Sequence, residues 1–178
     1  THLPLFTDVV ICSVRPSDNP AWIQTLRAKF KLDPLIIRWD LPLEIPLRYP
    51  KPETLGPDRI CNACAAATRF ERPVAAFDFG TAITCDVVDR TGSFIGGLIA
   101  PGLRVMTDYL HERTVLLPEA TYQPIRRLIG RSTVEAMQIG LHRMITGFVR
   151  ETAEALRQHF GPSITLCATG GDAHRLRL

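Results

Sequence analysis

The chain has 178 residues, of which 46% are hydrophobic and 22% charged, and this is the composition of a globular protein with a substantial core. A net charge of +3 without any basic run argues against a nucleic-acid-binding protein. No apolar stretch approaches the ~20 residues that a membrane span needs, and no signal peptide is recognisable, so we expect a cytoplasmic protein that binds neither nucleic acid nor membranes.

The first part of the chain predicts two buried strands, at 8–14 and 34–39, with a helix at 17–30 between them. The apolar face of this helix consists of Trp22, Ile23, Leu26 and Phe30. Proline-rich residues 40–57 then predict a loop, and long ordered loops are often functional.

The middle of the chain predicts a helix at 58–70 followed by three strands. The strands are expected at 74–79, 82–88 and 93–100. Tight turns containing Gly80 and Gly92 would join them as an antiparallel meander.

The last part predicts a helix at 101–111, a longer helix at 132–160 and a final strand running into the glycine turn of "TGGDA" (169–173). Ser132 and Glu135 form a capping box at the start of the longer helix. Its apolar stripe consists of Val134, Met137, Leu141, Met144, Ile145 and Phe148.

Five cysteines are scattered through segments that we expect to be buried. Their odd number favours free thiols in a reducing compartment. Cys61 and Cys64 form a CxxC pair inside a helical pattern and without a second pair, which favours packing over zinc binding or redox chemistry.

The segment "LGPDR" (55–59) places an acidic and a basic residue at the start of a predicted helix. Asp58 could be a base that takes a proton from a substrate hydroxyl, and Arg59 could hold an anionic group through bidentate bonds. Alternatively, Asp58 only stabilises the helix N-terminus.

The segment "DFGTAIT" (78–84) places an aspartate, a glycine and hydroxyls at the bend of a predicted hairpin. Backbone N–H groups at such a bend can bind a phosphate, Asp78 can bind a cation, and Thr81 can contact a terminal phosphate. The alternative is a polar turn between two core strands.

Two further segments could hold an anion. In "IGRSTVEAMQIG" (129–140), Gly130, Ser132 and Thr133 form a helix N-terminus with free N–H groups, although helix capping alone explains Ser132. The glycine pair of "TGGDA" could approach a nucleotide, or it could simply end the strand.

Taken in order, these segments resemble the type III pantothenate kinase family, which belongs to the superfamily of acetate and sugar kinases, Hsp70 and actin. The resemblance covers residues 49–173 and includes "LGPDR", "DFGTAITCD", "GSFIGGLIAPGL", "LLP", "IGRSTVEAMQIG" and "TGGDA". It implies an α/β fold of the actin-like ATPase (ribonuclease H-like) type, with mixed sheets flanked by helices. Two domains are implied: residues 1–72 would end an incomplete first domain that includes the substrate loop, and residues 73–178 would form a second domain without its last helices.

The resemblance also implies an activity, the ATP-dependent phosphorylation of pantothenate to 4′-phosphopantothenate, the first step of coenzyme A biosynthesis. Asp58 would be the general base, Thr81 would contact ATP, and Asp78 would bind a monovalent cation, K⁺ or NH₄⁺. The implied substrate-binding residues are Tyr49, Gly56, Pro57, Asp58, Arg59 and Thr133. Family members require Mg²⁺ with ATP and work as homodimers with pockets near the subunit interface.

One family feature is missing from the sequence. The family begins with a D-x-G-N-T strand–turn–strand, the first phosphate loop, whereas this sequence opens on "THLPLFTDVV", which resembles a later family segment. The chain could be a truncated form of a complete enzyme, a degenerate relative, or a chain whose partner supplies the loop. We favour truncation because every other catalytic position is intact.

Two other functions remain open at this stage. One is a catalytically degenerate, pantothenate kinase-like binding or regulatory protein on the same scaffold. The other is a kinase that acts on a different small hydroxyl compound, which rests on superfamily analogy alone.

Overall fold

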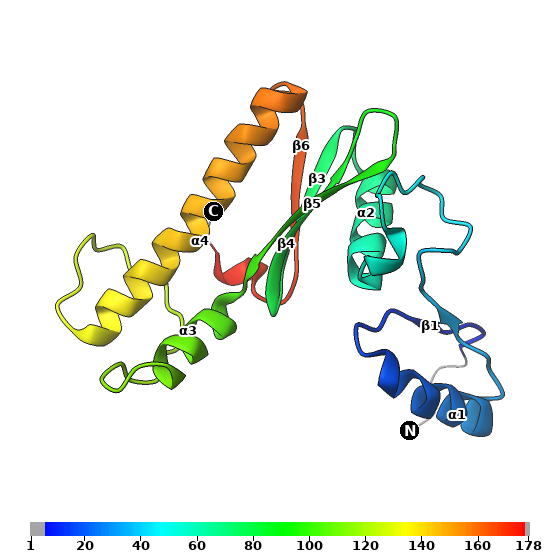
Figure 1. The fold of residues 1–178 in the computed structure, drawn as a ribbon, viewed down its shortest axis with the longest axis horizontal. Coiled ribbons are helices and arrows are strands. Elements are labelled where there is room, and N and C mark those ends of the chain that lie inside the picture. The colour runs from blue at the N-terminus through cyan, green and yellow to red at the C-terminus, as the bar shows by residue number, and fades with distance from the viewer. Residues whose placement is uncertain (1–5, 177–178) are drawn as a thin grey trace.

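A four-stranded mixed sheet forms the centre of the protein (Figure 1). In the computed structural model, which describes residues 6–176, β3 (Val74–Phe79), β4 (Ala82–Val88) and β5 (Phe94–Pro101) follow one another as antiparallel neighbours. β6 (Thr165–Thr169) pairs in parallel with β3, which gives the order β5-β4-β3-β6. The predicted meander is therefore confirmed.

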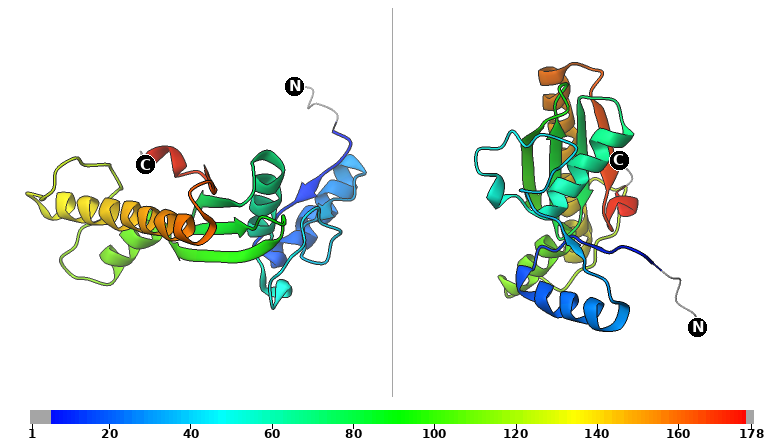
Figure 2. Two further views of the ribbon diagram at one scale, coloured as in Figure 1. Left: turned by 90° about the horizontal axis from the view of Figure 1, so that it is seen from above. Right: turned by 90° about the vertical axis from the view of Figure 1, so that its right-hand side faces the viewer.

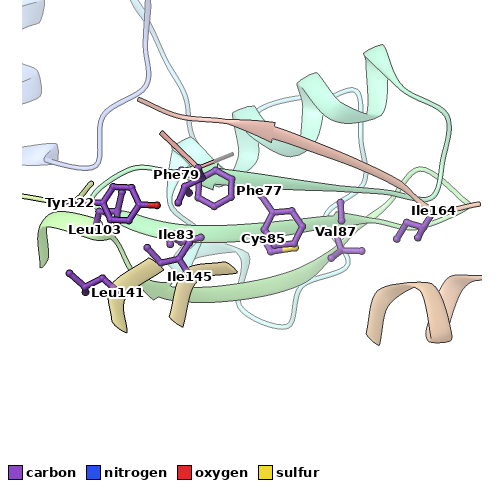
Figure 3. Packing of buried hydrophobic residues seen from close by; sticks show 12 residues of the cluster. Phe77, Phe79, Ile83, Cys85, Val87, Leu103, Tyr122, Leu141, Ile145 and Ile164 are labelled. Atoms are coloured by element: carbon purple, nitrogen blue, oxygen red, sulfur yellow. The ribbon is translucent and has the colours of Figure 1, made fainter. Parts of the chain in front are cut away.

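Helices cover both faces of this sheet (Figure 2). α2 (Pro57–Arg69) packs on one face, and α3 (Leu103–Glu112) and α4 (Thr133–Phe160) pack on the other. Figure 3 shows the α4 side, where Phe77, Phe79, Ile83 and Cys85 of the sheet meet Leu141 and Ile145 of the helix. The chain is thus an α/β protein with a mixed sheet between helices.

Because side chains alternate along a strand, the even-numbered residues of β3 and β4 lie on the α2 face. The apolar ones pack against α2 as a second core cluster, which includes Val74, Ala76 and Val88. The same alternation places three polar side chains on this face, namely Asp78, Thr84 and Asp86. The α2 face is therefore the polar side of the sheet.

The N-terminal residues form a small unit beyond α2, on the side away from α4 (Figures 1 and 2). A parallel pair, β1 (Val10–Ile11) and β2 (Leu35–Ile36), flanks a 3-10 turn, η1 (Pro16–Asp18), and α1 (Asn19–Phe30). The helix confirms the prediction, but the two strands are only two residues long.

The predicted burial of this unit is wrong. Val10 is 59% exposed, and on the expected apolar face of α1 the side chains of Trp22 and Phe30 are 59% and 39% exposed. A two-stranded sheet offers too little surface to bury a helix face, and no other described element covers it. Cys12 lies in this unit and is exposed as well, although we expected the cysteines to be buried.

The proline-rich loop is anchored to the sheet. It contains a 3-10 turn, η2 (Pro52–Thr54), and an isolated parallel bridge between Leu47 and Phe94. The Phe94 carbonyl accepts a hydrogen bond from Arg48 N–H at 2.8 Å, and Phe94 N–H donates to the Pro46 carbonyl at 2.9 Å. The loop therefore runs along the start of β5.

The predicted cap of α4 is confirmed. Ser132 Oγ accepts a hydrogen bond from Glu135 N–H at 3.2 Å, and the Glu135 carboxylate accepts one from Arg131 N–H at 2.8 Å. Two members of the predicted stripe are exposed, Val134 by 37% and Met144 by 62%. The first turns of α4 extend past the sheet (Figure 1), so they have less surface to pack against. No helix within residues 6–176 is long and apolar enough to cross a membrane.

Candidate functional site

Helix α2 begins without a side-chain cap. Gly56 is the N-cap residue, and its carbonyl accepts hydrogen bonds from the N–H groups of Arg59 and Ile60 at 3.1 and 3.3 Å. Asp58 lies in the first turn, half-buried, and its carboxylate makes no capping hydrogen bond. A side chain at position 56 would collide with that carboxylate, so the glycine leaves room for it. A capping hydrogen bond therefore does not account for Asp58, while its charge in the first turn is favoured by the helix dipole.

Arg59 points inward to a buried carboxylate. Its Nε donates to Asp86 Oδ1 at 2.6 Å, and Thr84 Oγ1 donates to Asp86 Oδ2 at 3.1 Å. Asp86 is fully buried, and the Arg59 side chain is only 9% exposed. Burial raises the pKa of Asp86, and the Arg59 guanidinium opposes that rise. The Nε that a bidentate contact with a substrate anion could use is thus already bound to Asp86.

An aromatic pair connects Arg59 to the proline-rich loop. The Arg59 guanidinium carbon lies 5.6 Å from the centroid of the Phe94 ring, and the Phe94 and Tyr49 ring centroids are 5.9 Å apart. A Cβ at Gly96, where φ is +122°, would lie 3.7 Å from Tyr49 Cε2. The structure therefore brings Tyr49 next to the segment that carries Asp58.

The two glycine-containing segments of the sheet meet at Asp78. Its Oδ2 accepts a hydrogen bond from Asn62 Nδ2 at 2.8 Å. Gly170, with φ of +97°, lies so close that a Cβ would collide with Asp78 Oδ1 and with the Phe79 backbone. Asp172 N–H donates to the Phe79 carbonyl at 3.0 Å. "DFGT" and "TGGD" thus form one backbone-lined corner.

The β3–β4 turn is tight and supported from behind. Gly80 N–H donates to the Ala82 carbonyl at 3.1 Å, and Gly102 N–H donates to the Thr81 carbonyl at 3.0 Å. A Cβ at Gly102 would collide with the carbonyls of both turn residues. Thr81 itself is exposed. Its hydroxyl is therefore accessible on a rigid turn next to Asp78.

Helix α2 joins the predicted substrate loop to this corner. Asp58 and Asn62 are four residues apart and so lie on the same side of the helix. Because Asn62 binds Asp78, the second turn of α2 lies beside the end of β3, one helical turn from Asp58. Thr133 is not part of this arrangement, because the N-terminal end of α4 lies at the opposite end of the molecule from α2 (Figures 1 and 2).

Asn62, Thr84 and Asp86 are not among the predicted site residues, but each of them makes a side-chain contact within the candidate site. A signal for Asp86 was present, since an aspartate within an apolar strand needs a buried partner. Asn62 belongs to the segment that resembles the family, but an asparagine on a helix does not indicate which residue it binds.

The corner suits a cation bound by oxygen atoms better than a transition metal. Residues 6–176 contain no group of three or more His, Cys, Asp or Glu side chains that could hold a metal ion. Asp78 offers a single carboxylate beside exposed backbone, and hard cations accept carboxylate and carbonyl oxygens together. A monovalent cation, or Mg²⁺ held largely by phosphates, fits this set.

A separate hollow of about 590 Å³ lies between α4 and β6. Aromatic and basic side chains line it, among them Phe77, Phe79, Arg143, Arg150 and Arg157. None of the predicted site residues lines it. The candidate site therefore lies on the α2 face of the sheet and does not coincide with this hollow.

Comparisons with known proteins give a consistent family. A family model described as type III pantothenate kinase matches residues 1–155. The chain is 39% identical over 167 residues to the type III pantothenate kinase of Methylacidiphilum infernorum, covering 92% of this chain and 60% of that protein. It is 44% identical over 134 residues to that of Akkermansia muciniphila, covering 75% and 55%. The chain spans about 60% of the length of these relatives.

A solved structure shares the fold. It is described as a conserved Baf family transcriptional activator from Campylobacter jejuni, and it matches with a TM-score of 0.61 at 20% identity, covering 96% of this chain and 71% of that one. At this identity the likeness extends to the fold alone.

Proposed function

The chain belongs to the type III pantothenate kinase family, and we propose that the protein transfers a phosphoryl group from ATP to the primary hydroxyl of pantothenate. The product is 4′-phosphopantothenate, which enters coenzyme A biosynthesis. The observation that carries the proposal is the family match together with the α2 face, where Asp58 lies one helical turn from Asn62, the hydrogen-bond partner of Asp78. Phosphoryl transfer depends mainly on positioning and charge neutralisation, and these are the parts it requires.

Asp58 is the general base of this proposal. Its carboxylate is half-buried and makes no capping bond. Asp58 lies in the first turn of α2, and Asn62 of the same helix is hydrogen-bonded to Asp78 of the sheet. A base must reach the proton that it abstracts. Asp58 accepts the proton of the pantothenate hydroxyl as that oxygen attacks the terminal phosphate.

The corner at Asp78 is the proposed nucleotide side of the site. Thr81 contacts ATP from the exposed β3–β4 turn. Gly170, which has no side chain, lets its backbone pack closely against Asp78 and the Phe79 backbone. Asp78 and nearby carbonyl oxygens would hold a monovalent cation, K⁺ or NH₄⁺. Mg²⁺ bound to ATP would neutralise charge on the phosphates, which suits a site with few carboxylates.

The acceptor side of the proposed site, where pantothenate would bind, consists of the proline-rich loop and the first turn of α2. Gly56, Pro57 and Arg59 shape the substrate loop, and Tyr49 contacts pantothenate from the anchored loop. The supporting observation is that the Phe94 ring lies next to the Arg59 guanidinium and also packs against the Tyr49 ring. Pantothenate would thus lie between an aromatic side chain and the base.

We propose that the protein is a homodimer, because Thr133 lies far from the other predicted substrate-binding residues of its own chain. This residue is expected to contact substrate, but α4 begins far from α2 in the same chain. A second copy that brings its Thr133 to the Asp58 of the first would complete the pocket. Exposed apolar side chains around the start of α4, among them Leu128, Ile129 and Val134, are compatible with such an interface.

The fold proposal is an actin-like, ribonuclease H-like architecture. Residues 73–178 would form the second domain and residues 1–72 part of the first, with α2 of the first lying on the sheet of the second. A small-molecule kinase of this kind would work in the cytoplasm, with pantothenate and ATP as its partners and without nucleic acid or membrane.

A coupled assay of ADP release by the full-length protein tests the activity. We expect ADP release that depends on pantothenate, with little release when glycerol or pantetheine replaces it. Absence of pantothenate-dependent release would contradict the proposal. Pantothenate binding in a calorimeter without ATP turnover would instead indicate the regulatory alternative, and a preference for another hydroxyl compound would indicate a different kinase.

A further inference from the structure

The buried ion pair between Arg59 and Asp86 connects the sheet to the residue next to Asp58. Asp86 is fully buried in β4, and both of its oxygens accept hydrogen bonds, one from Arg59 Nε and one from Thr84 Oγ1. The two charged residues are 27 positions apart in the sequence, so the pair joins α2 to the sheet. A buried pair of this kind is weak evidence for stability, which leaves a role in fixing geometry open.

The surroundings of the guanidinium are shaped to hold it in one place. Gly97 lies opposite Asp86 in the β4–β5 register, and a Cβ there would lie 2.9 Å from Arg59 Nη2. The Phe94 ring packs against the guanidinium on another side. Nη2 is buried without a hydrogen-bond partner. Arg59 therefore occupies a fitted slot in which Asp86 is the only carboxylate bound to it among the described residues.

A fixed Arg59 also fixes its neighbours. Asp58 precedes it in the first turn of α2, where the Arg59 N–H binds the Gly56 carbonyl. Phe94, which touches the guanidinium, also packs against Tyr49. One buried carboxylate is thus connected through Arg59 both to the proposed base and to the proposed substrate tyrosine.

We propose that Asp86, supported by Thr84, is a positioning residue: by holding the Arg59 side chain it sets the position of Asp58 and Tyr49 toward pantothenate. The inference rests on the proposed function. Because Asp86 is fully buried and binds Arg59 and Thr84, its loss should affect the acceptor side of the site and leave the nucleotide side intact.

The test compares Asp86→Asn with wild-type full-length protein in steady-state kinetics. The substitution keeps the shape of the side chain and removes its charge. We expect kcat/KM for pantothenate to fall by about tenfold or more, since small displacements of a catalytic group are costly, while KM for ATP stays within about twofold. Hydrogen exchange should become faster in the first turns of α2 and stay unchanged in α4. The matched control is Asp89→Asn, which removes a carboxylate from the turn of the β4–β5 hairpin and should leave the kinetics unchanged.

Each outcome decides the question. Wild-type kcat/KM for pantothenate in folded Asp86→Asn overturns the inference, and so does a rise in KM for ATP as large as the loss of kcat/KM for pantothenate. If Asp86→Asn does not fold, Thr84→Val removes a single hydrogen bond to Asp86. It should lower kcat/KM for pantothenate by about threefold, and an unchanged value overturns the inference. A wild-type protein without pantothenate-dependent ADP release would instead contradict the proposed function.

Discussion

Asn62 Nδ2 donates a 2.8 Å hydrogen bond to Asp78 Oδ2, and this bond joins the helix that carries Asp58 to the strand end that carries the proposed cation ligand. The other Asp78 oxygen faces Gly170. One carboxylate therefore connects three segments of the site. An outer partner of this kind orients a ligand and adjusts its affinity.

Replacing Asn62 by alanine should weaken cation activation. Without its amide partner Asp78 is free to rotate, so the K⁺ concentration for half-maximal activity should rise by about tenfold or more, which is typical when an outer-shell partner is lost. A K⁺ titration of ADP release measures this. Thr68→Ala, at the far end of the same helix, is the control, and an unchanged K⁺ dependence in Asn62→Ala would show that Asp78 does not bind the cation.

Replacing Asp58 by alanine should lower kcat by about 10²-fold or more, the usual contribution of a positioned base. The reason is that the attacking hydroxyl then keeps its proton. The matched control is Glu53→Ala, which removes an exposed carboxylate from η2 in the same loop and should leave kcat unchanged. Undiminished activity in folded Asp58→Ala would sink the assigned mechanism.

The sequence predicted local structure well because local signals determine it. Apolar runs separated by Gly80 and Gly92 define β3, β4 and β5 to within a residue, and the capping box defines the start of α4. Residues of contiguous motifs could also be proposed for the site from the sequence alone, and these roles stay predictions. Asp58 and Asp78 are examples, since each lies at the boundary of a predicted element.

Contacts across the sheet could not be predicted in the same way. The Arg59–Asp86 pair depends on which face of β4 meets α2, and that follows only once the sheet is assembled. The exposure of Trp22 and Phe30 on α1 could not be predicted for a related reason. The apolar pattern that contains Trp22 indicates a face that can be buried, and the pattern does not say whether another element covers it.

The turn between β4 and β5 should give the protein an acid-sensitive contribution to stability. Burial of Asp89 by itself would raise the pKa of its carboxyl group. Hydrogen bonds from the Thr91 hydroxyl and from the Ser93 and Thr91 N–H groups outweigh this effect and lower the pKa of Asp89. A carboxyl group whose pKa is lower in the folded than in the unfolded protein stabilises the fold at any pH above its unfolded pKa of ~4. This stabilisation is lost as the pH falls through the folded-state pKa. Asp89→Ala should therefore be about 1 kcal/mol less stable at pH 7. Urea unfolding from pH 7 to 3 should show this difference shrinking below pH ~4, and a constant difference would contradict the assignment.

Cys85 should be chemically silent in the folded protein. Burial, together with the neighbouring Asp86, raises the pKa of its thiol to about 12, and the side chain is fully buried among core residues. Only the thiolate reacts with alkylating reagents. Iodoacetamide should therefore modify Cys85 only as fast as the protein unfolds, whereas half-buried Cys61 on α2 provides the faster reference. Mass spectrometry of peptides from both regions measures the two rates, and equal rates would contradict the buried position of Cys85.

A mixture of two impaired variants can test whether Thr133 acts across a dimer. Asp58→Ala lacks the base, and Thr133→Ala should raise KM for pantothenate, so each variant alone is weak at low pantothenate. In a mixed dimer, one pocket combines the intact Asp58 of one copy with the intact Thr133 of the other. Random mixing makes about half of the dimers mixed, and one of the two pockets in each mixed dimer is intact. About a quarter of wild-type activity should therefore return. If the pocket used Asp58 and Thr133 of the same chain, no mixed dimer would contain an intact pocket and no activity would return. Analytical ultracentrifugation of the mixture separates that outcome from a protein that does not dimerise.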